Sequence, residues 1–277
     1  MQKEIASPTL EASATYSISS GQIAARSGGQ ISFDTYGDGP PLVLVHGAFS
    51  DHQTNWTYVK SLLAPHFRVY AIARRGRGAT DAATDRALED EFEDVAALIR
   101  LIDEPVFLLG HSYGAHVALG TAAAVPHLVR KLIVYEPAWP QLLEAAAMEK
   151  LKNLADSNGW DAFALAFFGD LLLVPQADLQ ALRMSDDWPP IVEDAAASYA
   201  DIRALAGYDF DIERFKDLPI PVLLQTGGES LSELWATDAL AAILPDGKVS
   251  VLRSAAHEAM TTDPEQYVED VRRFLKG

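Results

Sequence analysis

The sequence predicts an α/β fold in which a mostly parallel sheet lies between layers of helices. Short runs rich in Val, Leu and Ile recur along the chain, and longer segments with helical spacing of apolar residues alternate with them. Nearly continuous apolarity is typical of strands buried on both faces, and βαβ units require this alternation with helices. The 277 residues are enough for one such sheet with an insertion.

The expected buried strands are residues 42–45, 68–72, 106–109, 132–135, 222–225 and 249–252. Residues 16–19 and 30–36 alternate more regularly between apolar and polar side chains, which predicts an antiparallel start of the sheet. Helical spacing predicts helices over residues 56–63, 88–102, 113–125, 234–244 and 264–275. In the last of these, we expect Asp263 as N-cap, Pro264 at the first helical position and Gln266 closing a capping box.

The alternation of strands and helices stops between residues 138 and 208, which contain helical patterns broken by Pro and Gly. We expect residues 14–137 and 209–277 to form the α/β core, residues 138–208 a helical cap or lid, and residues 1–13 a flexible N-terminal tail. The inserted segment is rich in Trp and Phe, which would suit the inner face of a cap. Most of these aromatic residues are expected to form the core of the helical subdomain itself.

Composition restricts the partners that the chain is expected to bind. Its 39 acidic and 22 basic residues give a formal net charge of −17, spread along the chain. This charge would repel nucleic acid and anionic membranes, so we expect neither as a partner. With no cysteine, disulfides and thiolate nucleophiles are excluded. No apolar segment has the length of a membrane span or the pattern of a signal peptide, which favours a cytoplasmic protein; the sequence does not predict an oligomeric state.

The motif Gly110-His111-Ser112-Tyr113-Gly114 lies between a predicted buried strand and a predicted helix. A serine on such a sharp turn has a strained backbone and an exposed hydroxyl, and the glycines on both sides avoid a collision. The N-terminus of the following helix also presents unpaired N–H groups where an oxyanion would form. We therefore predict Ser112 as a nucleophile that attacks an acyl carbonyl.

The segment Val45-His46-Gly47-Ala48-Phe49 ends another predicted strand. An oxyanion needs two donors, and we expect them to be the N–H groups of Tyr113 and Ala48, with Phe49 as the alternative to Ala48. His46 precedes this loop, so we interpret it as a structural histidine.

His257 is the candidate general base, because it alone among the histidines follows the last predicted strand. The end of that strand lies at the same edge of the sheet as the serine turn, which makes proton abstraction geometrically feasible. His111 and His116 are interpreted as packing residues near the turn.

Together with Arg75-Gly76-Arg77-Gly78 and Tyr135-Glu136-Pro137, these motifs resemble the α/β-hydrolase superfamily from about residue 32 to 275. The resemblance implies an eight-stranded, mostly parallel sheet, a helical lid after the sixth strand, and catalytic residues in the order Ser, acid, His. It does not specify a substrate.

The position of the acid departs from the common family pattern. Many members have an Asp after the seventh strand, where this chain has Ser230. Two candidates follow: Glu136, at the end of the sixth strand, and Glu229, next to the common position. We favour Glu136, because an interior carboxylate without a partner would be costly, whereas Glu229 is easily explained as a solvated loop residue. Arg74, Arg75 and Arg77 are interpreted as turn and surface residues.

The predicted function is a serine hydrolase that cleaves a small, apolar carboxylic ester or lactone through an acyl-enzyme on Ser112. A cofactor-free perhydrolase or haloperoxidase and a C–C bond hydrolase are alternatives that would use the same residues. A non-catalytic binding protein with the same fold is an alternative from another class. No metal site and no cofactor site are predicted, since the ligand spacings and phosphate-binding loops that they require do not occur.

Overall fold

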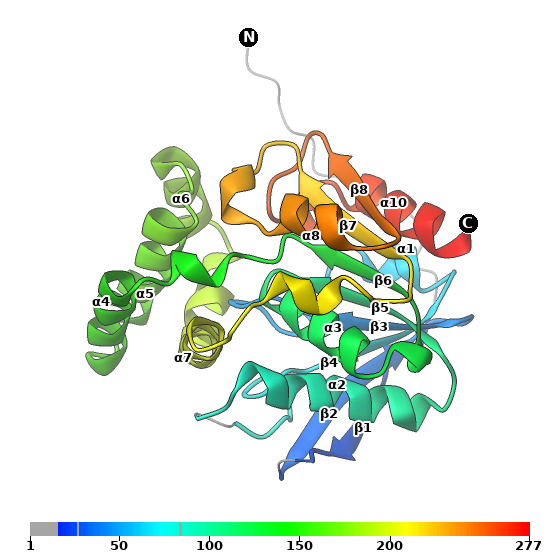
Figure 1. Cartoon of the computed structure of the whole chain (residues 1–277). Helices are drawn as coiled ribbons and strands as arrows, with labels where there is room; N and C mark the ends of the chain where they lie inside the picture. Colours follow the sequence, from blue (N-terminus) through cyan, green and yellow to red (C-terminus); the bar gives the residue numbers. More distant parts are fainter. Residues whose placement is uncertain (1–15, 27, 83–84) are drawn as a thin grey trace.

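The computed structural model describes residues 16–26, 28–82 and 85–277, and these residues form an eight-stranded sheet in the order β1-β2-β4-β3-β5-β6-β7-β8 (Figure 1). The strands are β1 (Ser19–Ala24), β2 (Gln30–Tyr36), β3 (Pro41–Val45), β4 (Arg68–Ile72), β5 (Val106–His111), β6 (Val129–Tyr135), β7 (Val222–Gly227) and β8 (Gly247–Leu252). The pairings of β1 with β2 and of β2 with β4 are antiparallel, and the other pairings are parallel. The predicted mostly parallel sheet is confirmed.

Helices cover both faces of the sheet, which explains why the central strands are apolar at successive positions. In β3, Val43 and Val45 pack toward α2 (Leu88–Ile102), α3 (Tyr113–Ala124) and α8 (Thr237–Ile243). Leu42 and Leu44 pack on the opposite face, toward α1 (Lys60–Leu63), α9 (Ala259–Thr262) and α10 (Pro264–Lys276). Side chains alternate along a strand, so each face of the sheet contributes its own apolar layer.

The chain between β6 and β7 forms the helices that we call the helical insertion. They are α4 (Ala145–Asp156), α5 (Trp160–Ala166), a π-helical segment (Phe167–Leu171), α6 (Gln176–Arg183) and α7 (Trp188–Ala206). These helices lie to one side of the sheet in Figure 1 and share an apolar cluster that includes Phe163 and Trp188. The division into core and cap at residues 138 and 208 stays a prediction. Short 3-10 segments are Pro126–Leu128, Pro140–Leu142, Ile212–Phe215 and Ser232–Leu234.

Several element boundaries differ from those expected. The first strand begins only at Ser19, where pairing with Thr35 of β2 begins, so the strand predicted over residues 16–19 is wrong. The helices predicted over residues 56–63 and 234–244 are shorter, as α1 and α8. Asp263 caps α10 by accepting a hydrogen bond from Gln266 N at 3.3 Å, but the return bond that would close a capping box is absent within the described residues. The tail predicted over residues 1–13 lies outside the described residues.

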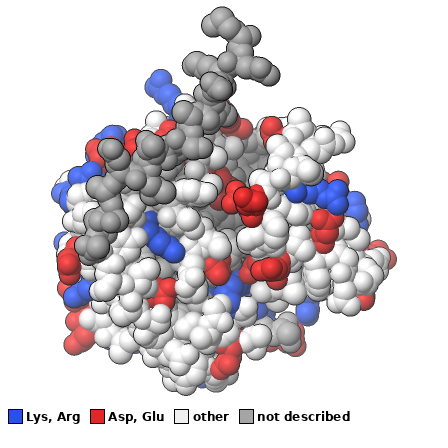
Figure 2. Space-filling view, turned by 180° about the vertical axis from the view of Figure 1, so that it is seen from behind, with Lys and Arg blue, Asp and Glu red and all other residues white. Residues whose placement is uncertain are grey.

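No helix of the described ranges combines the length and apolarity needed to cross a membrane. Figure 2 shows one face of the molecule, on which acidic and basic side chains are interspersed among uncharged ones. On that face, neither sign of charge forms a continuous surface.

Candidate active site

Ser112 occupies a sharp turn between β5 and α3. Its backbone has φ 55° and ψ −119°, an unfavourable conformation for a residue with a side chain. Ser112 N donates to Tyr135 O at 2.8 Å, which ties the turn to β6. A Cβ atom on Gly110 would lie 2.2 Å from Gly114 O, and one on Gly114 would lie 2.3 Å from Val45 O. Only glycine fits at both positions, as the motif predicts.

A small apolar pocket lies over Ser112. The core contributes Ala48, Ser112 and Tyr113 to its wall, and the segment after β6 contributes mainly large apolar side chains. Those side chains are Trp139, Leu142, Leu143, Phe167, Leu171, Leu172, Ile202 and Leu205. The cavity volume is about 40 Å³, or roughly three water-sized volumes. Such a space suits a short apolar group better than a long chain.

Backbone N–H groups on two loops border this pocket. Tyr113 is the first residue of α3, so its N–H has no partner inside the helix. Within the described residues, neither Tyr113 N nor Ala48 N donates a hydrogen bond. In contrast, Phe49 N donates to Ser198 Oγ at 2.6 Å. Of the two candidates for the second donor, Ala48 is therefore the one with an available N–H.

His257 and Glu136 form a close pair beside this turn. Glu136 follows β6, is fully buried and places its Oε2 atom 2.7 Å from His257 Nδ1. Its other oxygen, Oε1, accepts from Gly227 N at 2.7 Å and from Thr226 Oγ1 at 2.8 Å. Burial alone would raise the pKa of Glu136, but the hydrogen bond and charge of His257, together with Gly227 N–H, outweigh it and lower that pKa. Glu136 therefore favours the ionised form.

Glu229, the alternative acid, has a different environment. Its side chain is exposed, and its backbone N–H donates to Ala255 O at 3.0 Å. It makes no hydrogen bond with His257 among the described residues. The structure thus brings Glu136, and not Glu229, to the far nitrogen of the imidazole.

The His257 ring is also fixed by stacking. Trp235 lies parallel to it, with ring centroids 4.3 Å apart and an interplanar angle of 8°. The His257 side chain is 17% exposed, so the ring is accessible but confined. Neither Trp235 nor its role can be deduced from a motif, because it lies on the loop between β7 and α8 without a distinctive sequence pattern.

His111 connects the loops on either side of the serine. Its Nε2 lies 2.9 Å from the carbonyl oxygen of His257, and its Nδ1 lies 3.2 Å from Asn55 Oδ1. The same Asn55 oxygen accepts from Gly47 N at 2.8 Å. Burial, with a smaller effect of the neighbouring His257, lowers the pKa of His111 well below its usual value. A neutral imidazole has a single N–H, and both of these neighbours are oxygen atoms, so His111 donates to only one of them at a time. The buried ring packs between the two loops, in keeping with its interpretation as a packing residue, and Asn55 is a contributor that sequence reasoning missed.

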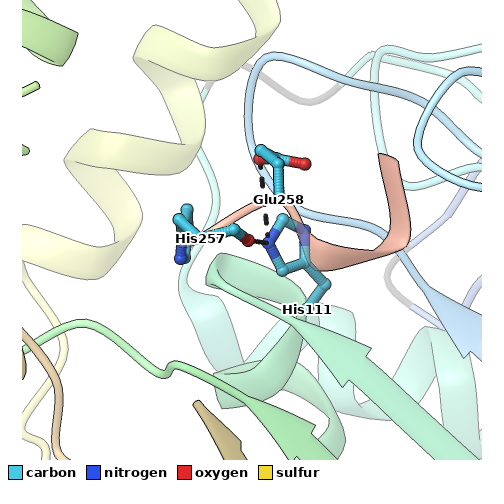
Figure 3. A group of neighbouring side chains, drawn as sticks. All are labelled: His111, His257 and Glu258. Carbon is cyan, nitrogen blue, oxygen red and sulfur yellow. Dashed lines mark hydrogen bonds and ion pairs between the residues drawn. The ribbon is translucent and has the colours of Figure 1, made fainter. Parts of the chain in front are cut away.

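Potential metal-ligand atoms of His111, His257 and Glu258 lie within 4.8 Å of one another (Figure 3). Figure 3 shows the carbonyl oxygen of His257 directed at the His111 ring, and the two imidazole rings also lie close, with centroids 4.7 Å apart. Each ring nitrogen of His111 lies next to an oxygen atom, Nδ1 of His257 is bound to Glu136, and the Glu258 side chain is 51% exposed. The group is therefore explained by hydrogen bonding without an ion.

The arginines after β4 are buried, so their interpretation as surface residues is wrong. Arg74 and Arg77 are each 3% exposed, and Arg75 is 5% exposed. Their carboxylate partners come from α2 and α7, which are distant in sequence: Glu91, Asp94, Asp194 and Asp201. Charges can be buried here because each guanidinium is paired with a carboxylate.

His46 is a structural histidine, as expected. It is fully buried, its Nδ1 lies 2.8 Å from Gly47 O, and its Nε2 accepts from Arg74 N at 3.2 Å. Burial, reinforced by the charges of Arg74 and Arg77, lowers the pKa of His46 well below its usual value. His46 is therefore neutral and helps to connect the β3 loop with the β4 loop.

The fold and this arrangement of residues define a class of protein. A model of the alpha/beta hydrolase family matches residues 42–270, so the chain belongs to that family. The resemblance seen in the motifs is confirmed, and the chain is a hydrolase of the α/β type.

Individual relatives are more distant. The chain is 27% identical over 253 residues to a 2-(acetamidomethylene)succinate hydrolase from Mesorhizobium japonicum. This match covers 86% of this chain and 89% of that protein. A local match to a pyrrolizixenacetamide deacetylase from Xenorhabdus hominickii is 34% identical over 110 residues, 38% of this chain and 40% of that protein. Among solved structures, an alpha/beta hydrolase from Sphaerobacter thermophilus is similar with a TM-score of 0.77 and 28% identity, covering 90% of this chain and 99% of that one.

Proposed function

We propose that the protein is a serine hydrolase that cleaves a small carboxylic ester or lactone through an acyl-enzyme on Ser112. The observation that carries the proposal is the Glu136–His257 pair, 2.7 Å apart, next to a serine turn that opens on an apolar pocket. A base oriented by a buried carboxylate is the arrangement that activates a serine hydroxyl.

In the proposed mechanism, His257 Nε2 takes the proton of Ser112 Oγ as this oxygen attacks the acyl carbonyl. Glu136 keeps the proton of the imidazole on Nδ1 and stabilises the imidazolium that forms. The N–H groups of Ala48 and Tyr113 donate to the new oxyanion. The intermediate then collapses, the leaving alcohol takes the proton from His257, and a water molecule repeats the sequence to release the acid and restore Ser112.

The pocket indicates the size of the acyl group. Its wall is apolar and its volume of about 40 Å³ would accommodate an acetyl or propionyl group. A long acyl chain would require the helical insertion to move. We therefore expect the specificity constant to fall as the acyl chain lengthens from acetyl to octanoyl.

Labelling by a fluorophosphonate probe, together with hydrolysis of p-nitrophenyl acetate, tests the proposal. The wild-type protein should label and turn over, and Ser112→Ala should lose labelling and at least about a thousandfold in kcat. Ser157→Ala, which changes an exposed serine of the helical insertion, is the matched control and should behave as wild type. Labelling and turnover that survive in Ser112→Ala would refute the proposal.

A second candidate is hydrolysis of a small N-acyl compound. Two relatives are named for substrates that contain an acetamide group, and an acetyl group matches the pocket. Parallel assays with p-nitrophenyl acetate and p-nitroacetanilide distinguish the candidates. A specificity constant for the anilide equal to or above that for the ester would favour the amide.

A further inference from the structure

The loop that contains Ala48 makes a hydrogen bond on each side of this residue, one to Arg74 and one to Ser198. Ser198 lies on helix α7, and Arg74 donates a hydrogen bond to Asp201 of the same helix. On one side, Gly47 O accepts a hydrogen bond from Arg74 Nη2 at 2.8 Å. In a trans peptide the C=O and N–H bonds point in opposite directions, so fixing Gly47 O also fixes the direction of Ala48 N–H. On the other side, Phe49 N donates to Ser198 Oγ at 2.6 Å.

Ser198 is itself fixed in one orientation. It is fully buried on α7, donates to Asp194 Oδ2 at 2.7 Å and accepts from Arg77 Nη2 at 3.1 Å. A hydroxyl has one donor and two acceptor positions, and with Phe49 N–H all of them are used. The hydroxyl therefore cannot rotate away from Phe49 without losing a bond to a charged group.

The backbone of Phe49 needs this support. Its φ is 56°, in the left-handed region that a bulky residue rarely adopts. Its ring packs against Phe167 and Phe168 of the helical insertion, with centroids 4.8 and 4.9 Å away. Both the N–H and the ring of Phe49 are thus held by the insertion, and the unfavourable conformation persists because these contacts maintain it.

We propose that Ser198 is a positioning residue that keeps Ala48 N–H directed at the pocket over Ser112, and that helix α7 thereby completes the oxyanion-binding site. The inference rests on the proposed function, since it assigns Ser198 a role in the same acyl transfer. Ser198 acts through the loop and does not touch the substrate. The helical insertion would then contribute to the rate of the chemical step as well as to the walls of the pocket.

A series of variants at this position tests the proposal. Ser198→Ala removes the acceptor and should lower kcat for p-nitrophenyl acetate roughly 10- to 100-fold, somewhat less than the loss of an oxyanion donor itself. Ser198→Thr keeps the hydroxyl and should restore most of the rate, and Ser198→Cys, a weaker acceptor of similar shape, should be intermediate. The Cys variant provides the comparison if the Ala variant does not fold.

Inhibition by a short aryl trifluoromethyl ketone gives a readout that a merely structural role would not change. This inhibitor forms a hemiketal oxyanion on an activated serine, so its affinity should weaken along the Thr, Cys, Ala series by the same factors as kcat. Thr121→Ala is the control, because it also removes a buried hydroxyl, one that donates to Val117 O within α3. It should lower the melting temperature and leave kcat and inhibitor affinity unchanged.

The two possible failures are distinguishable. A wild-type protein that neither turns over nor labels at Ser112 would refute the proposed function and this inference with it. An active wild type whose Ser198 variants keep full kcat and full inhibitor affinity, whatever their melting temperatures, would overturn the inference alone.

Discussion

Two fully buried carboxylates, Glu136 and Asp201, are stabilised in different ways. Asp201 on α7 accepts hydrogen bonds from Arg74, Arg77 and Arg86. Burial would raise the pKa of Asp201, but the charges of Arg74 and Arg77 outweigh it and lower that pKa. Glu136 instead has one histidine and neutral donors. Permanent charges fix Asp201 in one state, whereas the partner of Glu136 can gain and lose a proton, as the proposed mechanism requires.

The largest effect should come from Glu136→Gln. The amide would present a donor to His257 Nδ1, favour the wrong tautomer and leave the imidazolium without a countercharge, so kcat should fall by about 10³- to 10⁴-fold. The melting temperature should change little, because the amide has the same shape. Steady-state kinetics with p-nitrophenyl acetate and circular dichroism measure the two effects.

Glu229→Gln is the matched control for this change, since Glu229 is exposed. It should keep nearly full activity. If Glu229→Gln lost more activity than Glu136→Gln, the acid would have to be reassigned to Glu229.

For Asp201 we expect the substitution to lower stability, in contrast to Glu136→Gln, which should change the melting temperature little. Asp201→Asn leaves buried arginines without a full countercharge, and removing one partner of a buried pair typically costs about 3–5 kcal/mol of unfolding free energy. Urea denaturation measures this loss. An unchanged unfolding midpoint would show that the arginines are neutralised by Glu91 and Asp194 without Asp201.

His116 is a third kind of buried ionisable group, because it is kept neutral and is not paired with an opposite charge among the described residues. Its Nε2 lies 2.7 Å from Ala138 O, and burial lowers its pKa from 6.5 to about 4. Between these values the unfolded chain binds a proton that the folded chain does not, so stability should fall as the pH falls from 6.5 to 4. The contribution of His116 to this loss is about 3 kcal/mol.

Urea denaturation of His116→Gln at several pH values tests this contribution. The variant should lose a large part of the pH dependence in that window, whereas His127→Gln, at an exposed position, should keep it. An identical pH dependence in His116→Gln and wild type would contradict the prediction.

The smallest effect is expected at an exposed ion pair. Arg272 and Glu269 lie 3.2 Å apart on α10 with side chains 36% and 56% exposed. Solvent screens such pairs, so Glu269→Gln should change the unfolding free energy by less than about 1 kcal/mol. A loss comparable to that of Asp201→Asn would mean that burial is not what separates the two kinds of site.

Local patterns were sufficient to predict the sheet and the serine turn. The apolar strands, the glycines around Ser112 and the loop at Ala48 each depend on a few consecutive residues. The preference for Glu136 over Glu229 did not come from a local pattern. It came from the free-energy cost of burying a carboxylate without a partner, and the structure places Glu136 beside His257.

The features that were predicted wrongly or missed involve residues whose contact partners lie far away in the sequence. The positions of Arg74 and Arg77 depend on Asp201, which is more than 120 residues later and carries no motif. The contact between Phe49 and Ser198 joins residues 149 positions apart. Such contacts follow from how α7 packs on the core, and no local pattern specifies that packing.

The stacking of Trp235 on His257 gives the site an intrinsic optical reporter. An excited indole loses its emission efficiently to a protonated imidazole in van der Waals contact, and the rings are 4.3 Å apart and nearly parallel. The difference in fluorescence between wild type and Trp235→Phe should therefore report when the His257 ring takes up a proton. With stopped-flow mixing, the same signal would time the proton transfer during acylation without a chromogenic substrate.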